Sequence, residues 1–423
     1  MRRRLMTAML IAACAAGAAA PARAGQSQAP ARMTFQQAVA RAVERNPSGL
    51  QAAEEILRAD ALLRQGRALG LPSVSAGVTE TSLSYKSSVT PQHQVAGTVT
   101  ATVPVYAPIQ WALRVQLMDN RQIAEMAALD VRRQIAVATA QAYLSVVARQ
   151  RVLDANLRAS DTARAHFEFA RQRRESGAGS RLNELRAQQS LSSVDVLVEQ
   201  AQSDLVRAQE ALGVFVAEDG PVTAADDPAL EVPASLDAAI GAMPAVRTDL
   251  RLAAAREKAA ARVASDSRKD WLPSLSALFQ PQIAQPVSSY QPAFTFRFQL
   301  SGSIPVFDAG ARAAKRAERE VLLKESQIAL SGLLRQASAD VRVAQAAVDR
   351  AARALASARA AARQAREVVE IVNVSFKVGA STNIEVIDAQ RAALDADTAA
   401  AVAEDQLRQA RLSLLVALGR FPQ

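Results

Sequence analysis

Two acidic side chains lie three residues apart in the segment NIEVIDAQ, Glu385 and Asp388. On a helix these carboxylates share one face, where they attract cations and repel each other, unless the face is simply solvated. The two histidines, His93 and His166, are far apart and have no cysteine partner, so no metal site is predicted. The sequence shows no nucleophile triad, phosphate loop or catalytic carboxylate pair. We therefore expect neither an enzyme nor a bound cofactor.

The first 24 residues are predicted to be an export signal. They combine a basic start, an apolar run from Leu5 to about Ala20 and the sequence ARA ending at Ala24, which predicts cleavage after Ala24. The alternative is a lipobox, IAAC, in which Cys14 would be lipidated. Cys14 is the only cysteine, so no disulfide framework is expected.

The net charge of +9 does not indicate nucleic-acid binding. Four of the positive charges lie in the export signal, and elsewhere the basic residues alternate with acids along predicted helices. After the signal there is no run of about 20 apolar residues, so a membrane location would require a β-barrel.

The rest of the chain is one unit present twice. LPSVSA at Leu71 is matched by LPSLSA at Leu272, and VPVY at Val103 is matched by IPVF at Ile304. Both separations are 201 residues, which indicates an internal duplication. The predicted boundaries are 33–215 for the first repeat, 216–235 for a Pro-, Asp- and Gly-rich linker, and 236–421 for the second repeat.

Each repeat is predicted to open with a short helix and a medium one. Thr34 can cap the first short helix, with Gln37 completing a capping box, and Asn46-Pro47 ends it. In the second repeat, Ser235 is the expected cap and Met243-Pro244 the expected end. The medium helices are expected at about 48–69 and 246–270.

Two long helices are predicted to close each repeat. The first of each pair, at about 109–174 and 311–377, contains no proline. Roughly 60 residues at about 1.5 Å each give a rod of about 100 Å, so these helices must pack side by side. Glycines mark the turns that follow them: Gly177, Gly179 and Gly379.

Four strands are expected at about 72–83, 94–106, 272–282 and 293–307. In the last strand, Phe294, Phe296 and Phe298 lie on one face, while Arg297 and Gln299 lie on the other. Strands of about 10 residues with an apolar outside and a polar inside are typical of a transmembrane β-barrel. A half-buried soluble sheet is the alternative. Four strands cannot close a barrel, for which about eight are the minimum, so we expect the chain to oligomerise.

Strand and helix are predicted to meet without a loop in both repeats. Pro104 marks this junction between strand and helix in the first repeat. Pro305 and Gly310 mark it in the second, with the strand reaching Phe307 and the helix starting near Ala311.

The segments IPVFDAGARAAK and VGASTNIEVIDAQ, within this duplicated unit, resemble the TolC-like outer-membrane factor family over essentially the whole mature chain. The resemblance implies a mainly α fold with a transmembrane β-barrel part. Three chains of a homotrimer would share a 12-stranded barrel in outer-membrane lipid, continued by a long periplasmic α-helical barrel. The implied partners are a periplasmic adaptor (membrane fusion) protein and an inner-membrane pump or ABC transporter, and no nucleic acid.

The resemblance also implies where function lies. Glu385 and Asp388 would ring the periplasmic mouth, and Glu184 and Asn183 occupy the matching place after the first turn. Some family members carry an arginine at the positions of Ser381 and Thr382, where it links neighbouring helices. This link is not expected here. The residues implied to contact the adaptor are Gly177, Gly179, Ser180, Gly379, Ala380 and Ser381.

The expected function is the outer-membrane channel of a tripartite efflux system that exports small molecules such as drugs. The same duct in a type I protein secretion system is one alternative. An exported coiled-coil scaffold protein is an alternative of another class.

Overall fold

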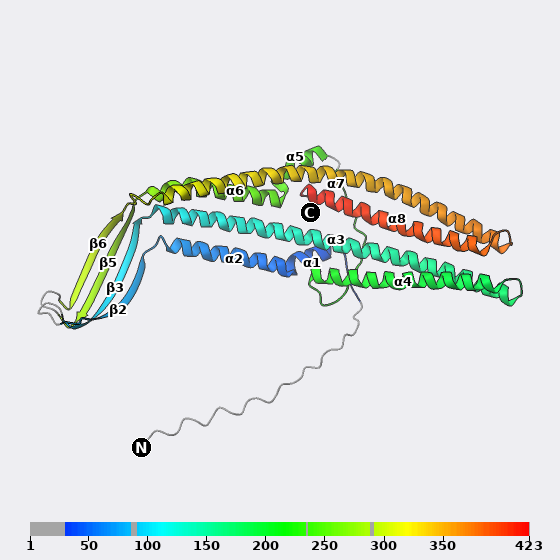
Figure 1. The fold of residues 1–423 in the computed structure, drawn as a ribbon, viewed down its shortest axis with the longest axis horizontal. Coiled ribbons are helices and arrows are strands. Elements are labelled where there is room, and N and C mark those ends of the chain that lie inside the picture. Colours follow the sequence, from blue (N-terminus) through cyan, green and yellow to red (C-terminus); the bar gives the residue numbers. More distant parts are fainter. Residues whose placement is uncertain (1–29, 86–90, 234–235, 288–291, 423) are drawn as a thin grey trace, which may run out of the picture.

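The computed structural model describes residues 30–85, 91–233, 236–287 and 292–422. It shows one elongated molecule, with a β-sheet at one end and the turns of two long helical hairpins at the other (Figure 1). The predicted signal peptide and Cys14 lie outside the described residues, as does Ser235, the expected cap of the second short helix. The first repeat contains β1 (Ala31–Met33), α1 (Phe35–Arg45), α2 (Pro47–Ala68), β2 (Ser73–Ser82), β3 (His93–Tyr106), α3 (Pro108–Glu175) and α4 (Arg181–Val216). The second contains β4 (Val222–Ala224), α5 (Leu236–Val246), α6 (Thr248–Asp266), the 3₁₀ helix η1 (Ser267–Trp271), β5 (Ser274–Gln285), β6 (Phe294–Ser303), α7 (Ala311–Lys377) and α8 (Asn383–Ala417).

The larger sheet is antiparallel and has the strand order β2-β3-β5-β6. The β3–β5 pairing joins the two repeats, with Val95 opposite Gln285 and a bulge after Pro104. β2 and β6 are the two edges of this sheet, and each is 10 residues long.

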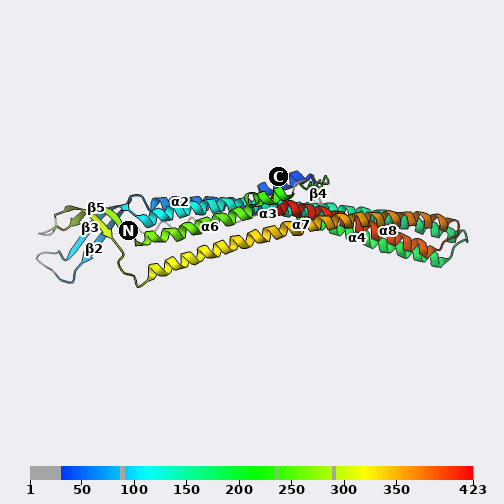
Figure 2. The same cartoon turned by 90° about the horizontal axis from the view of Figure 1, so that it is seen from above.

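The same lateral order continues into the helices. Next to the sheet, α2 packs on α3, α3 on α6 and α6 on α7. Beyond the middle of the molecule, α4 takes the place of α2 and α8 takes the place of α6, beside the unbroken α3 and α7 (Figures 1 and 2). With 68 and 67 residues, α3 and α7 are rods of about 100 Å, as the sequence predicted. Within the described ranges, no helix has both the length and the apolar character needed to cross a membrane.

Midway along the molecule, the end of one helix meets the start of another within each repeat (Figure 1). Asn46, the N-cap of α2, donates its side-chain amide to the carbonyl of Phe215 in the last turn of α4, at 3.2 Å. Arg247, which stands 201 residues later as the N-cap of α6, donates to the carbonyl of Ala417 at the end of α8, at 3.3 Å. The last carbonyls of a helix lack partners within that helix. We refer to these two places as the first and second helix joints.

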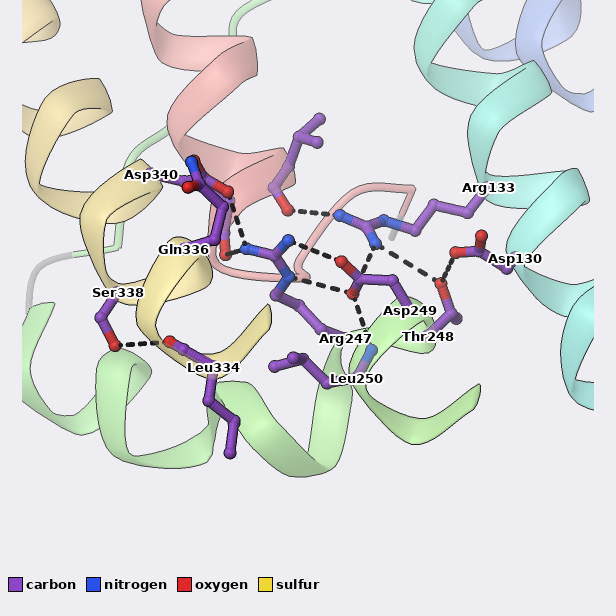
Figure 3. A network of polar contacts seen from close by, with 12 residues as sticks. Asp130, Arg133, Arg247, Thr248, Asp249, Leu250, Leu334, Gln336, Ser338 and Asp340 are labelled. Carbon is purple, nitrogen blue, oxygen red and sulfur yellow. Dashed lines mark hydrogen bonds and ion pairs between the residues drawn. The ribbon is translucent and has the colours of Figure 1, made fainter. Parts of the chain in front are cut away.

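The second helix joint carries a larger network of polar side chains (Figure 3). Arg247 pairs with Asp249 at 2.6 Å and with Asp340 at 3.6 Å. Arg133 of α3 pairs with Asp249 at 3.6 Å and donates to the carbonyl of Val416 at 2.6 Å. Burial acts to raise the pKa of Asp249, but hydrogen bonds and charge from Arg247 outweigh burial and hold that pKa below its ordinary value. The network ties α3, α6, α7 and α8 together at one level.

The main core lies beside the first helix joint. β1 and β4 pair there in parallel, so the predicted linker contains a buried strand. Tyr143 of α3 is fully buried and hydrogen-bonds the carbonyl of Met33 and the carboxylate of Asp226. Burial, followed by the Asp226 hydrogen bond, raises the pKa of Tyr143 to about 12. Phe35 and Phe421 pack in the same cluster, which brings both ends of the described chain together.

Several predicted element ends are wrong. α5 continues through Pro244 to Val246, because a proline in the last turn of a helix removes only one backbone bond. His93, which precedes the strand expected from about residue 94, begins β3 opposite Ser82 and hydrogen-bonds the Ser82 side chain at 3.1 Å. β5 extends to Gln285, three residues beyond the prediction. The medium helix expected to reach residue 270 ends at Asp266 and continues as η1.

Candidate functional site

The turns between α3 and α4 and between α7 and α8 have the same design. Gly177 and Gly379 adopt φ angles of 76° and 82°, a left-handed conformation that side chains with a Cβ disfavour. The Gly177 N–H donates to the carbonyl of Arg174, and the Gly379 N–H donates to the equivalent carbonyl of Phe376. The sharp turns predicted at these glycines are present in the structure.

Gly179 is favoured for another reason. A Cβ at this position would lie 3.1 Å from backbone atoms of Arg173 and Arg174, so a larger residue would require the turn to shift slightly. Ser180 then caps α4 by accepting the N–H of Asn183 at 3.3 Å. In the second turn, Ala380 closes the end of α7 by donating its N–H to the carbonyl of Ser375, and the Ser381 hydroxyl donates to the carbonyl of Val372 at 3.1 Å.

Glu385 has a local role in the fold of α8. Its carboxylate accepts the N–H of Thr382 at 3.0 Å, and the Thr382 hydroxyl accepts the N–H of Glu385 at 3.4 Å. This capping box places a negative charge at the positive end of the helix, which is electrostatically favourable. The Glu385 side chain nevertheless remains exposed.

Asp388 lies almost one turn further along α8 and is also exposed. It borders a groove of ≈ 1090 Å³ that α3, α4, α7 and α8 line together, with Ile384 and Ile387 among its apolar walls. No ion pair joins Glu385 or Asp388 to another residue in the described part of the chain. The two carboxylates therefore leave their charge open to solvent or to a further copy of the chain.

The corresponding residues of the first turn behave differently. Glu184 is mostly buried and pairs with Arg174 at 2.8 Å, so it closes its own hairpin. Asn183 contributes its backbone: its carbonyl accepts the side-chain amide of Asn383 from the second hairpin, at 3.3 Å. The bond between the hairpins at this point runs through Asn383, a residue that sequence analysis did not select.

His166 is the other residue that sequence analysis set aside. It is buried on α3, its Nε2 lies 2.7 Å from the Oδ1 of Asn383, and its ring packs on Phe376 of α7 at 5.3 Å. Burial lowers the pKa of His166, against the opposing effect of the Asn383 hydrogen bond. A neutral imidazole that donates from Nε2 therefore holds α8, and through Asn383 also α4. A signal was present in the sequence, because His166 follows Ala163 and precedes Ala170 at the spacing of a buried stripe.

The large sheet has one apolar and one polar face, and the strand register aligns them across all four strands. One row across the sheet consists of Val78, Gly97, Ile283 and Phe294, and the next row, on the opposite face, begins at Gly77 with Thr98 beside it. The alternation predicted from sequence is therefore in phase between the repeats. Most large apolar side chains of the first face are at least 38% exposed: Val74, Val78, Val95, Val99, Val103, Phe279, Ile283, Phe294, Phe296, Phe298 and Leu300. Exposed apolar surface on this scale indicates contact with lipid or another protein.

The two junctions between sheet and helices are not equivalent. In the first repeat, β3 runs through Pro104 to Tyr106, and α3 begins two residues later, as predicted. In the second repeat, β6 ends at Ser303, so the predicted strand as far as Phe307 is wrong.

A physical reason for the early end of β6 lies at Pro305 and Arg312. Pro305 has no N–H to donate to a strand, and its carbonyl accepts from Arg312 of α7 at 2.8 Å. Arg312 also pairs with Asp308 at 2.7 Å and lies over the ring of Trp271, at 5.6 Å. A short irregular link, with Gly310 at a φ of 88°, thus replaces the direct passage that we predicted.

A sheet with one apolar face that continues into a wall of long paired helices is the architecture of outer-membrane channel proteins with a periplasmic extension. The model of the outer membrane efflux protein family matches residues 38–216 and 240–420, so the chain belongs to this family. It is a TolC-type outer-membrane efflux channel and not an enzyme. The resemblance inferred from the sequence motifs is thereby confirmed.

Solved structures show the same fold at low sequence identity. CusC matches with a TM-score of 0.80 and 17% identity, covering 91% of this chain and 92% of CusC. The Campylobacter jejuni CmeC outer membrane channel matches with a TM-score of 0.79 and 14% identity, over 91% and 85% of the two chains. The Neisseria gonorrhoeae MtrE outer membrane channel, solved in an open state, matches with a TM-score of 0.78 and 19% identity, over 92% and 90%. No curated protein gives a significant match.

Proposed function

We propose that three copies of this chain form the outer-membrane channel of a tripartite system that exports small molecules such as drugs. The observation that carries the proposal is the sheet, in which an aligned apolar face ends at two unpaired edges, β2 and β6. An unpaired backbone group in lipid costs several kcal/mol, so an isolated four-stranded sheet is unstable there. Joining β6 of each copy to β2 of the next gives a 12-stranded barrel with no free edge.

The helical end of the molecule supports the rest of the proposal. The two hairpin turns lie at the far end from the sheet, where a periplasmic adaptor would contact Gly177, Gly179, Ser180, Gly379, Ala380 and Ser381 (Figure 1). An inner-membrane pump would complete the system. Glu385 and Asp388 would contribute six carboxylates to the mouth of the trimer, with Asn183 and Glu184 at the base of the neighbouring hairpin.

The first experiment measures assembly and conduction by the full chain. Expressed with its signal and extracted from outer membranes, the protein is expected to have the mass of a trimer, to migrate differently on gels after heating, and to form ion channels in planar bilayers. A monomer found wholly in the soluble periplasmic fraction would contradict the proposal and favour the coiled-coil scaffold.

Export of small molecules, as opposed to proteins, predicts that deleting the gene increases accumulation of a fluorescent drug such as ethidium. Unchanged accumulation together with loss of a secreted protein would instead assign the channel to type I secretion.

A further inference from the structure

The polar face of the large sheet carries a single charge among the described residues, that of Arg297. The other side chains of this face are hydroxyls, amides and small residues, together with one large apolar residue, Leu278. In chain order they are Ser73, Ser75, Gly77, Thr79, Thr81, Gln94, Ala96, Thr98, Thr100, Thr102, Ser274, Ser276, Leu278, Gln280, Gln282, Ala284, Thr295, Gln299, Ser301 and Ser303. The nearby acid Glu80 is paired opposite Val95, which places it on the apolar face.

Nothing in the described structure neutralises Arg297. Its cross-strand neighbour is Gln280, whose side-chain amide donates to Thr100 at 3.1 Å. The Arg297 side chain is exposed, and no ion pair joins it to another described residue. Each chain therefore presents one uncompensated positive charge on an otherwise neutral polar surface.

We propose that Arg297 gives the barrel lumen a preference for anions. This inference rests on the proposed function, because only a closed trimeric barrel brings the polar faces of three sheets around one axis. Three symmetric copies then place three guanidinium groups at one level of the lumen. A barrel of 12 strands, spaced about 4.8 Å apart and tilted by about 40°, has a backbone radius of about 12 Å. An inward side chain therefore brings its charge within about one Debye length of the axis at 0.1 M salt, about 10 Å.

The sign of this ring distinguishes it from the acidic mouth. Positive charges raise the local concentration of anions when they line a pore whose wall has a low dielectric constant. Loss of Arg297 should shift permeability toward cations, whereas loss of Glu385 and Asp388 should shift it toward anions. The two rings act in series, so each is measured as a change from the unmodified channel.

The experiment is a reversal-potential measurement on single trimers in planar bilayers. With about 0.01 M KCl on one side and about 0.1 M on the other, Arg297→Gln should lower the ratio of chloride to potassium permeability by at least about twofold. The effect should nearly vanish near 1 M KCl, where the Debye length is about 3 Å. An Arg297→Gln channel with an unchanged permeability ratio at low salt would overturn the inference.

Charge relocation supplies the matched control. Gln299 lies two residues along the same face, so the double variant Arg297→Gln/Gln299→Arg moves the ring by two residues along the strand and should restore the original ratio. Arg297→Lys should also keep it. Failure of both rescues would show that the shift came from altered barrel structure and would contradict the inference. If the unmodified protein forms no channel, the proposed function itself fails, and this outcome is separate from an unchanged ratio.

Discussion

At the scale of single residues, the mouth end of the chain depends on a short series of hydrogen bonds. His166 holds Asn383, and Asn383 holds the backbone of Asn183, so one buried imidazole connects both hairpins. Protonation would place a second N–H and a positive charge in a buried site beside the Phe376 ring, which the Arg173 guanidinium also contacts. The link between the hairpins is therefore sensitive to acid.

We expect the hairpin ends to loosen as the pH falls below about 6.5, the ordinary pKa of histidine. The folded-state pKa of His166 is lowered, so its stabilising contribution is complete above about 6.5 and is lost as pH falls toward that lowered pKa. Hydrogen exchange at the two turns, corrected for the intrinsic effect of pH on the exchange rate, measures this loosening.

His166→Gln keeps a donor for Asn383 and should abolish the pH response. His166→Ala leaves a buried amide unpaired and should cost about 1–3 kcal/mol at all pH values. A glutamine variant with the full pH response would exclude His166 as its source.

Local features of the candidate site could be predicted from sequence, and distant ones could not. The turns at Gly177 and Gly379 depend on a backbone conformation that glycine alone adopts easily, so they can be recognised within a few residues. The same is true of the Thr34 capping box. His166 finds its partner 217 residues away, and no local pattern specifies that contact.

At the scale of elements, the two helix joints perform the same task with different chemistry. Asn46 makes only neutral hydrogen bonds, donating to the carbonyl of Phe215 and accepting from the N–H of Ser48, whereas Arg247 is buried and makes ion pairs with Asp249 and Asp340 as well as a carbonyl bond. The duplicated positions therefore differ in how strongly they depend on one side chain.

Removing the side chain at the second helix joint should be the more damaging change. Arg247→Ala leaves the half-buried Asp249 carboxylate without its nearest ion-pair partner and the Ala417 carbonyl of α8 without its donor, and we expect it to lower the free energy of unfolding by about 1.5–3 kcal/mol. The matched variant Asn46→Ala removes a helix cap and should cost about 0.5–2 kcal/mol. Denaturant unfolding of the purified protein, followed by circular dichroism, compares them. Equal losses would contradict the assigned importance of the ion-pair network.

Element type was predictable where a long stretch of sequence carries one signal. α3 and α7 have no internal proline and a sustained apolar spacing, and their ends lie within a residue of the prediction. β1 and β4 are three residues each, too short for any alternation, and they exist because each covers the core around Tyr143. β6 ends early because Arg312, seven residues beyond Pro305, takes the carbonyl that a partner strand would use.

At the scale of the whole molecule, Arg297 and the acidic pair of α8 lie at opposite ends of the long axis. Arg297 lies in the sheet, while Glu385 and Asp388 lie near the hairpin turns at the opposite end (Figure 1). The carboxylates have no ion-pair partner within the described chain, so assembly decides what they face. Internal duplication was readable from one chain because both copies are present in it. The contacts between chains were not readable, since they join residues of different copies and leave no pattern of spacing along one sequence.

For the assembled channel, we predict that Glu385→Ala/Asp388→Ala increases single-channel conductance and weakens cation selectivity in planar bilayers. Six carboxylates around one axis attract cations and cannot all ionise freely, and removing them also widens the opening. Asp395→Ala is the matched control, because this exposed acid borders the same groove two turns further from the mouth. It should change neither quantity by a comparable amount. If the double variant conducts and selects like the unmodified channel, these two residues do not lie at the constriction.

The helix joints also have a mechanical consequence. α3 and α7 are continuous helices that run from the sheet to the hairpin turns. The lines formed by α2 with α4, and by α6 with α8, are interrupted, and side chains hold their two helices end to end. When continuous and interrupted helices alternate in one wall, the interruptions are the places where a twist applied at the hairpin turns needs the least distortion of helix backbone. Each chain therefore combines two continuous helices with two interrupted lines of helix, and a twist applied at the hairpin turns is expected to concentrate at the helix joints.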